Sequence, residues 1–191
     1  MAKTNDTAQE MFVVDLLVID TYQQFYHIRR LFAARLDYLG YKQDLKEMFN
    51  FQGQSHAYVA MLHANTQNFV NSLDEAGYNV HAKVPRKTNK GLYISFDVDL
   101  TIRVLDVNPS RLFLGSTSYN LIPLLKELRG RGCDIVVCAA GVPKAFKKFA
   151  HVQELSQDVL RNTGVSDKDN APVQQLELSS NSSSDASEGS T

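Results

Sequence analysis

The sequence is poor in cysteine and contains no tryptophan. Its two cysteines, Cys133 and Cys138, lie five residues apart in one apolar segment. An odd separation places two side chains on opposite faces of a strand, so we expect no disulfide between them. Two thiols without a disulfide framework favour a reducing, cytoplasmic compartment.

Long hydrophobic runs are missing as well. The longest, Met11 to Ile19, is interrupted by Asp15 and is far too short to cross a bilayer. The polar first ten residues have no signal-peptide character. The sequence therefore predicts no membrane partner.

A large charge of either sign is also absent, since the formal net charge is −1. The distribution is uneven, because the chain from Ser156 onward has six acidic and two basic residues, which leaves the rest with a net charge of +3. Residues 161–191 are acidic, rich in serine and poor in apolar residues, so we expect a disordered tail there. The mildly basic remainder is compatible with a nucleic-acid partner but does not require one.

Strand-like and helix-like segments alternate along residues 11–160. Strands are expected at 11–20, 56–62, 78–84, 111–116 and 133–141. Helices are expected at 22–39, 66–76, 121–129 and 144–160. Two segments stay open: 41–54 is helical or irregular, and 91–105 is strand or helix. The alternation predicts a single Rossmann-like α/β domain, with a mostly parallel five-stranded sheet flanked by helices, after a flexible N-terminus at 1–10.

Ligands of open parallel sheets bind outside the carboxyl ends of the strands. The polar residues expected at such ends are therefore the candidates for a functional site. They are Asp20, Asp97, Asp99, Ser116, Thr117, Ser118 and Asn120.

Four segments carry a resemblance to a known family. LLVIDTYQQ is an apolar strand that ends on Asp20, and FVNSLDEAGYNVHAKV is a helix and strand joined at a glycine. A basic loop leads to FDVDLTIRVL, which contains Asp97, and LGSTSYNLIPLLKELRGRG joins a strand end to a helix with Pro123 near its start. In order and spacing, residues 11 to 155 resemble the NYN domains of the PIN-like nuclease superfamily.

The resemblance implies an acidic metal site that is largely lost. NYN nucleases use acidic residues to hold Mg²⁺ or Mn²⁺, which activates water for phosphodiester hydrolysis. Asp20 and Asp97 match two of the acidic positions, whereas Arg103, Ser118 and Asn120 stand at others. We therefore expect no cofactor, or Mg²⁺ or Mn²⁺ bound weakly through Asp20 and Asp97.

Two functions remain open. The first is a catalytically degenerate domain, a pseudo-nuclease that binds nucleic acid, single-stranded RNA above all, or a protein partner such as a second copy of itself. The second is an active metal-dependent endoribonuclease that uses Asp20, Asp97 and Asp99 with help from Ser118 and Asn120.

Basic residues form two groups at segments that border the cleft in the family. The first group is Lys83, Arg86, Lys87 and Lys90, and the second is Lys144, Lys147 and Lys148. Phosphate contacts need only positive charge and reach, so nucleic-acid binding could outlast catalysis. Equally, such residues serve solubility, and in a pure scaffold protein the two groups would not form one surface.

Three residues of the altered site have specific expectations. Arg103 is expected to replace the metal by pairing with Asp20 or Asp97, and the competing arrangement is a surface pair with Asp99, four residues away. Tyr119 stands at a family glycine and is expected to fill the emptied cleft rather than to stack on a base. Asn120 has an alternative role as the N-cap of the helix that follows it.

Overall fold

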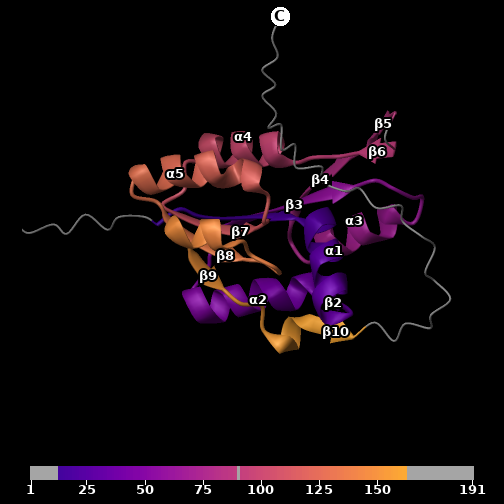
Figure 1. The fold of residues 1–191 in the computed structure, drawn as a ribbon. Helices are drawn as coiled ribbons and strands as arrows, with labels where there is room; N and C mark the ends of the chain where they lie inside the picture. Colours follow the sequence, from indigo (N-terminus) through magenta and orange to yellow (C-terminus); the bar gives the residue numbers. More distant parts are fainter. Residues whose placement is uncertain (1–12, 90, 163–191) are drawn as a thin grey trace, which may run out of the picture.

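The computed structural model describes residues 13–89 and 91–162 (Figure 1). Six parallel strands form the central sheet in the order β4-β3-β1-β7-β8-β9. They are β1 (Asp15–Asp20), β3 (Gln54–Ala60), β4 (Asn79–Lys83), β7 (Arg111–Gly115), β8 (Asp134–Cys138) and β9 (His151–Gln153). The predicted α/β fold with a mostly parallel sheet is confirmed, with six strands instead of five. The terminal segments expected to be disordered lie almost wholly outside the described residues.

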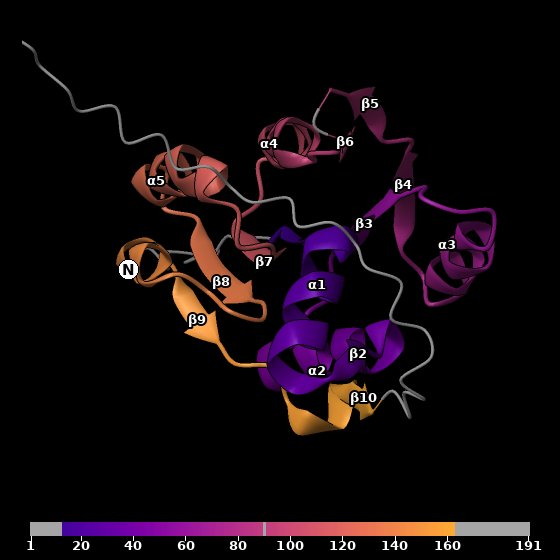
Figure 2. The same cartoon turned by 45° about the vertical axis from the view of Figure 1, so that its right-hand side comes forward.

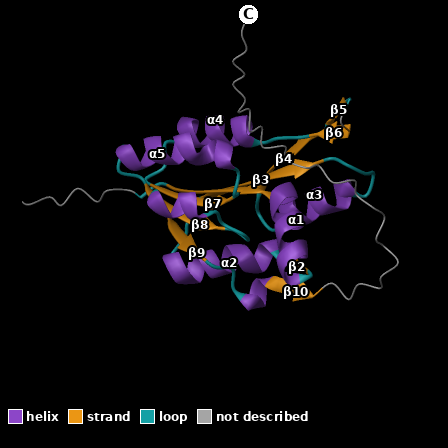
Figure 3. Ribbon diagram, viewed as in Figure 1, coloured by secondary structure: helices purple, strands orange, loops and turns teal. Residues whose placement is uncertain are grey.

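Helices cover both faces of the sheet (Figures 1 and 3). The helices of one face are α4 (Asp97–Val107) and α5 (Ile122–Gly130), and those of the other are α1 (Thr21–Phe32), α2 (Tyr38–Phe49) and α3 (Thr66–Glu75). None of the helices in the described part of the chain is long and apolar enough to span a membrane.

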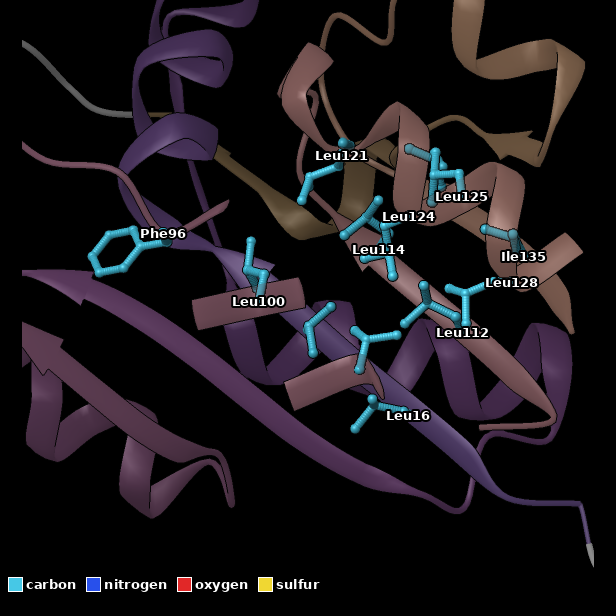
Figure 4. Close-up of a cluster of buried hydrophobic side chains, with 14 of the residues drawn as sticks. Leu16, Phe96, Leu100, Leu112, Leu114, Leu121, Leu124, Leu125, Leu128 and Ile135 are labelled. Atoms are coloured by element: carbon cyan, nitrogen blue, oxygen red, sulfur yellow. The ribbon is translucent and has the colours of Figure 1, made fainter. Parts of the chain in front are cut away.

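The sequence of β1 explains why both faces are covered. All six of its residues are buried. Successive residues of a strand point to opposite faces, so Leu16 and Val18 join the cluster beneath α4 and α5, which Figure 4 shows. Leu17 and Ile19 join the cluster on the opposite face. A strand that is buried at every position and has apolar residues toward both faces can sit only in the middle of such a sheet.

The two cysteines follow the same alternation. Both are free thiols. Cys133 packs against the cluster beneath α4 and α5, whereas Cys138 is buried in the opposite cluster. The prediction that they do not pair is confirmed.

Two small antiparallel sheets complete the fold. β2 (Ala34–Leu36) pairs with β10 (Leu160–Asn162), and β5 (Arg86–Thr88) pairs with β6 (Gly91–Tyr93) to form a hairpin. The hairpin lies where the sequence predicts a flexible basic loop, and the open segment 91–105 divides into β6 and α4. The helix expected at 22–39 ends earlier, because Ala33 adopts the left-handed conformation with φ of 50° and β2 follows it.

The prediction of one helix over 144–160 is wrong. This segment contains a 3₁₀ helix η2 (Lys144–Lys148), then β9, and a second 3₁₀ helix η3 (Gln157–Val159). Phe146 is buried in the cluster beneath α5, whereas Val159 is buried in the cluster on the opposite face. A single straight helix cannot reach both faces, so the chain passes around the β9 edge of the sheet.

Candidate nucleic-acid site at the carboxyl edge of the sheet

The sheet winds in opposite directions on either side of β1 and β7. β3 and β4 lie beyond β1, and β8 and β9 lie beyond β7. Ligands of such sheets bind outside the carboxyl ends of the strands at this reversal, and we call this position the crevice. Ile19 is paired with Gly115, so Asp20 and Ser116, the residues that follow them, lie at this point. The structure thus brings together the ends of two strands that are far apart in the sequence.

Asp20 connects β1 to α1. Its Oδ1 accepts a hydrogen bond of 2.9 Å from the backbone N–H of Gln23, so the carboxylate is the N-cap of α1. The residue is 7% exposed. Burial raises the pKa of Asp20 to about 6, and the nearby charge of Asp97 adds to this rise, while the backbone N–H groups of Gln23 and Tyr22 oppose it. The negative charge of Asp20 is therefore unfavourable in the folded protein.

Gln23 holds the two strand ends together. Its Oε1 accepts hydrogen bonds from the Ser116 hydroxyl at 2.8 Å and from the Thr117 backbone N–H at 2.6 Å. An amide oxygen has two lone pairs, and both are engaged here. Gln23 thus fixes the loop after β7 and has no acceptor left for a ligand.

Asp97 lies at the start of α4 and has two polar partners. Its Oδ2 accepts hydrogen bonds from the Ser95 hydroxyl at 3.0 Å and from Asn120 Nδ2 at 2.8 Å. Asn120 belongs to the 3₁₀ helix η1 (Tyr119–Leu121) and makes no capping bond to α5, so its alternative role as an N-cap is wrong. Ser118 precedes η1, and its carbonyl accepts a bond from the Leu121 N–H.

Asp99 and Arg103 face away from this pair of carboxylates. Asp99 Oδ2 lies 2.7 Å from Lys83 Nζ. Arg103 lies close to the Tyr58 hydroxyl, and among the described residues it forms no ion pair with Asp20, Asp97 or Asp99. Both arrangements expected for Arg103 are therefore wrong. Six helical residues turn through about 600°, so the side chain of Arg103 points toward β3 instead of the strand ends.

A histidine pair lies beside Arg103, and the sequence does not reveal it. His56 Nδ1 and His81 Nε2 are 2.9 Å apart, and the two rings are nearly parallel. Burial, His81 and Arg103 lower the pKa of His56 to about 4, and burial and Arg103 also lower the pKa of His81. The pair depends on the register of β3 against β4, for which neither histidine carries a local signal.

The two basic groups lie at opposite edges of the sheet. Arg86 and Lys87 are exposed on the hairpin that follows β4, and Lys83 ends β4. The second group is exposed on η2, between β8 and β9. Lys90 lies outside the described residues. The crevice at β1 and β7 is thus between the two groups in the strand order.

Tyr119 does not fill the crevice, contrary to expectation. Its side chain is 63% exposed and touches the buried ring of Phe146 edge-on, at 6.4 Å between ring centroids. Phe146 already occupies the space beneath it, so the Tyr119 ring remains accessible to a ligand.

The donor set at the crevice does not fit a hard divalent cation. Within residues 13–89 and 91–162, no three or more His, Cys, Asp or Glu side chains come together as a metal-binding group. Asp20 and Asp97 are the carboxylates here, and one oxygen of each already accepts hydrogen bonds. Asn120 presents N–H rather than oxygen to Asp97. Mg²⁺ and Mn²⁺ prefer several oxygen ligands.

Comparison with known proteins agrees with this fold. The model of the NYN domain family matches residues 22–160. A solved structure of a protein of unknown function from Vibrio parahaemolyticus superposes with a TM-score of 0.69 at 15% sequence identity, covering 80% of this chain and 99% of that one. Among curated proteins, no sequence matches this chain.

Proposed function

Because this chain belongs to the NYN domain family, a nuclease-like and RNA-related family, we propose that it is a catalytically degenerate member that binds single-stranded RNA. One observation carries the proposal. Asn120, at a position that is acidic in the NYN pattern, donates a hydrogen bond of 2.8 Å to Asp97. A donor therefore stands where a metal-binding carboxylate would be needed.

Hydrogen-bond donors take over part of a cation's role in this site. Asp97 is held by Ser95 and Asn120, and Asp20 is held by the backbone of α1. Hydrogen bonds to a carboxylate favour its charged form, although less than a bound cation does. The crevice keeps its shape in this way without presenting the oxygen ligands that phosphodiester hydrolysis by a metal requires.

The basic groups favour an extended, single-stranded ligand. Neighbouring strands lie about 4.8 Å apart, so β4 and β8 are separated by on the order of 20 Å. A strand of RNA that crosses the carboxyl ends of the sheet would reach Lys87 at one edge and Lys144 and Lys147 at the other. The phosphates would bind these lysines at the two edges, so the RNA backbone could pass Asp20 without placing a phosphate against its carboxylate.

Binding is tested with a labelled single-stranded RNA oligonucleotide, by fluorescence anisotropy at several salt concentrations. We expect weak, salt-sensitive affinity that Lys87→Glu with Lys147→Glu abolishes. Single replacements should lower the slope of log K against log salt by about 0.7 for each phosphate that the protein no longer neutralises. Lys46→Glu with Lys126→Glu is the matched control, because it changes the same charge at exposed sites on α2 and α5. Equal effects of the two pairs would contradict the proposal.

An active metal-dependent ribonuclease is the second candidate, and one observation favours it. Asp97 helps to raise the pKa of Asp20, and a cation between the two would relieve that repulsion. Calorimetric titration with Mn²⁺ and an RNA cleavage assay separate the candidates. We expect no metal binding and no cleavage, and a gain of Mn²⁺ binding in Asn120→Asp. Cleavage that Asp20→Ala abolishes would favour the ribonuclease.

A further inference from the structure

A large pocket lies beside the crevice, on the face of the sheet that α1, α2 and α3 cover. It has a volume of about 1060 Å³ and is bounded by these helices, β2, and the end of β3. Figure 2 shows α3 across from α1, with α2 and β2 below. Its volume lies just above the range of about 300–1,000 Å³ that is typical of ligand sites.

Aromatic side chains line two walls of this pocket, which we call the aromatic pocket. On α1, the ring of Tyr26 lies 4.8 Å from that of Tyr22 and 5.5 Å from that of Phe25. On the opposite wall, the rings of Tyr38 and Phe69 are 5.4 Å apart. Phe25 is 38% exposed, so part of its ring is open to a ligand. Accessible rings of this kind are stacking platforms for planar ligands such as nucleobases.

Positive charge accompanies the rings. The basic residues that line the aromatic pocket are Arg29, Arg35 and Arg161. Arg29 lies 5.9 Å from the centre of the Phe25 ring, and Arg161 is 74% exposed although it pairs with Asp37. With Asp37 and Glu75 as its acidic residues, the lining keeps a net positive charge. A matching ligand is planar and apolar on its faces and anionic along its backbone.

The aromatic pocket begins beside Asp20 in the chain. Thr21 and Tyr22, which line it, directly follow Asp20 in the chain. Thr21 is fixed there by a hydrogen bond of 2.8 Å to the carbonyl of Tyr58. A strand of RNA crossing the carboxyl edge at Asp20 therefore passes the mouth of the aromatic pocket.

From this arrangement we infer that the aromatic pocket binds unpaired nucleobases of the single-stranded RNA whose backbone crosses the carboxyl edge of the sheet. The inference rests on the proposed function and adds base stacking to its phosphate contacts. An apolar segment of another protein would use the rings but would have no use for the three arginines. Stacking is indifferent to base identity, so the site takes RNA with little sequence preference.

Two phenylalanines of α1 provide a matched test. Phe25 and Phe32 are 38% and 42% exposed, and only Phe25 lines the aromatic pocket. We expect Phe25→Ala to weaken binding of a single-stranded RNA oligonucleotide by about 5- to 150-fold, the range for losing one stacked base. Phe32→Ala should leave binding unchanged. Neither replacement removes a phosphate contact, so the salt slope should stay the same in both.

The absence of tryptophan allows a direct spectroscopic readout. Phe25→Trp gives the chain a single indole in the aromatic pocket, and Phe32→Trp gives one outside it. RNA should quench the emission of the first variant and not of the second. An abasic oligonucleotide with the same backbone should quench neither, because it has no base to stack.

The outcomes separate this inference from the proposed function. Salt-dependent RNA binding that Phe25→Ala leaves intact would overturn the base site and leave the proposed function standing. The absence of any RNA binding would contradict both the base site and the proposed function. Equal losses of RNA affinity in Phe25→Ala and Phe32→Ala would also overturn the base site. So would an emission of Phe25→Trp that changes with protein concentration in the absence of RNA, because it would assign the aromatic pocket to a second copy of the chain.

Discussion

The two ends of β1 carry the same residue in opposite circumstances. Asp15 opens the strand and Asp20 closes it, and both are almost fully buried, at 6% and 7% exposure. Asp15 is held by the Arg111 guanidinium in two bonds, of 2.9 Å to Oδ1 and 2.6 Å to Oδ2. Asp20 has the α1 backbone as its hydrogen-bond donor and faces a second carboxylate, Asp97.

Under the proposed function, this difference separates an end of the sheet that serves stability from an end that serves RNA binding. At the amino end, the chain places a fixed cation against a buried anion. At the carboxyl end, two anions stay close together, and the nearby Lys83 pairs with Asp99 instead. Folded proteins keep such unfavourable charge mainly where a site requires it. Removing charges at each end in turn tests this division of roles.

The largest effect is expected at the amino end. Arg111→Ala leaves the buried Asp15 without its cation, and breaking such a pair costs about 3–5 kcal/mol of folding free energy. Urea denaturation measures this loss. Arg131→Ala is the control, because its partner Glu127 is exposed and the pair is worth about 1 kcal/mol or less. Similar losses in both variants would show that Asp15 is not held more strongly than a surface residue.

The opposite sign is expected at the carboxyl end. The pKa of Asp20 is about 6 in the folded protein against a reference of 3.8, so above pH 6 the charged carboxylate destabilises the fold. Asp20→Asn removes the charge and keeps an oxygen that can cap α1. We expect a gain of up to about 3 kcal/mol at pH 7. The gain should fade between pH 6 and pH 4, as Asp20 becomes protonated in both states.

The gain at each pH is the difference in the free energy of unfolding between the Asp20→Asn variant and the unchanged protein. His56, with its pKa lowered to about 4, contributes stability that is present above about pH 6.5 and is lost as the pH falls toward 4. This slope opposes that of Asp20 but is common to both proteins. A difference that is absent at pH 7, or that persists at pH 4, would show that Asp20 is not the strained carboxylate.

Much of this fold is readable from the sequence, because it depends on local patterns. The continuous apolar run of β1 requires a central strand, and parallel strands bring their carboxyl ends to one edge. The approach of Asp20 and Ser116 follows from these two rules, and it does not depend on details of side-chain packing.

The remaining features depend on side-chain directions and strand register, which local patterns do not encode. Arg103 lies at an acidic position of the family pattern but points to Tyr58, because its direction depends on where α4 begins. The pair of His56 and His81 needs two strands in one register. The segment 144–160 has helical composition, yet its apolar residues are buried in clusters on opposite faces of the sheet.

The smallest effect on stability is expected for the ion pair at the carboxyl end. Lys83 and Asp99 are each 42% exposed, so solvent screens their attraction, and Lys83→Met should cost well under about 1 kcal/mol. A double-mutant cycle with Asp99→Asn should give a coupling free energy of the same small size. The corresponding cycle for Arg111 and Asp15 should give several times more.

For RNA affinity, the order of the two ends should be the reverse of their order for stability. Under the proposed function, Lys83 contacts a phosphate at the carboxyl edge, so Lys83→Met should lower the salt slope of RNA binding by about 0.7. Asp99→Asn should strengthen binding, because it releases Lys83 from its partner. Arg111→Ala, measured where the variant is folded, should leave the salt slope unchanged. If Lys83→Met costs as much stability as Arg111→Ala and leaves RNA affinity intact, then the two ends of the sheet do not divide stability and function between them.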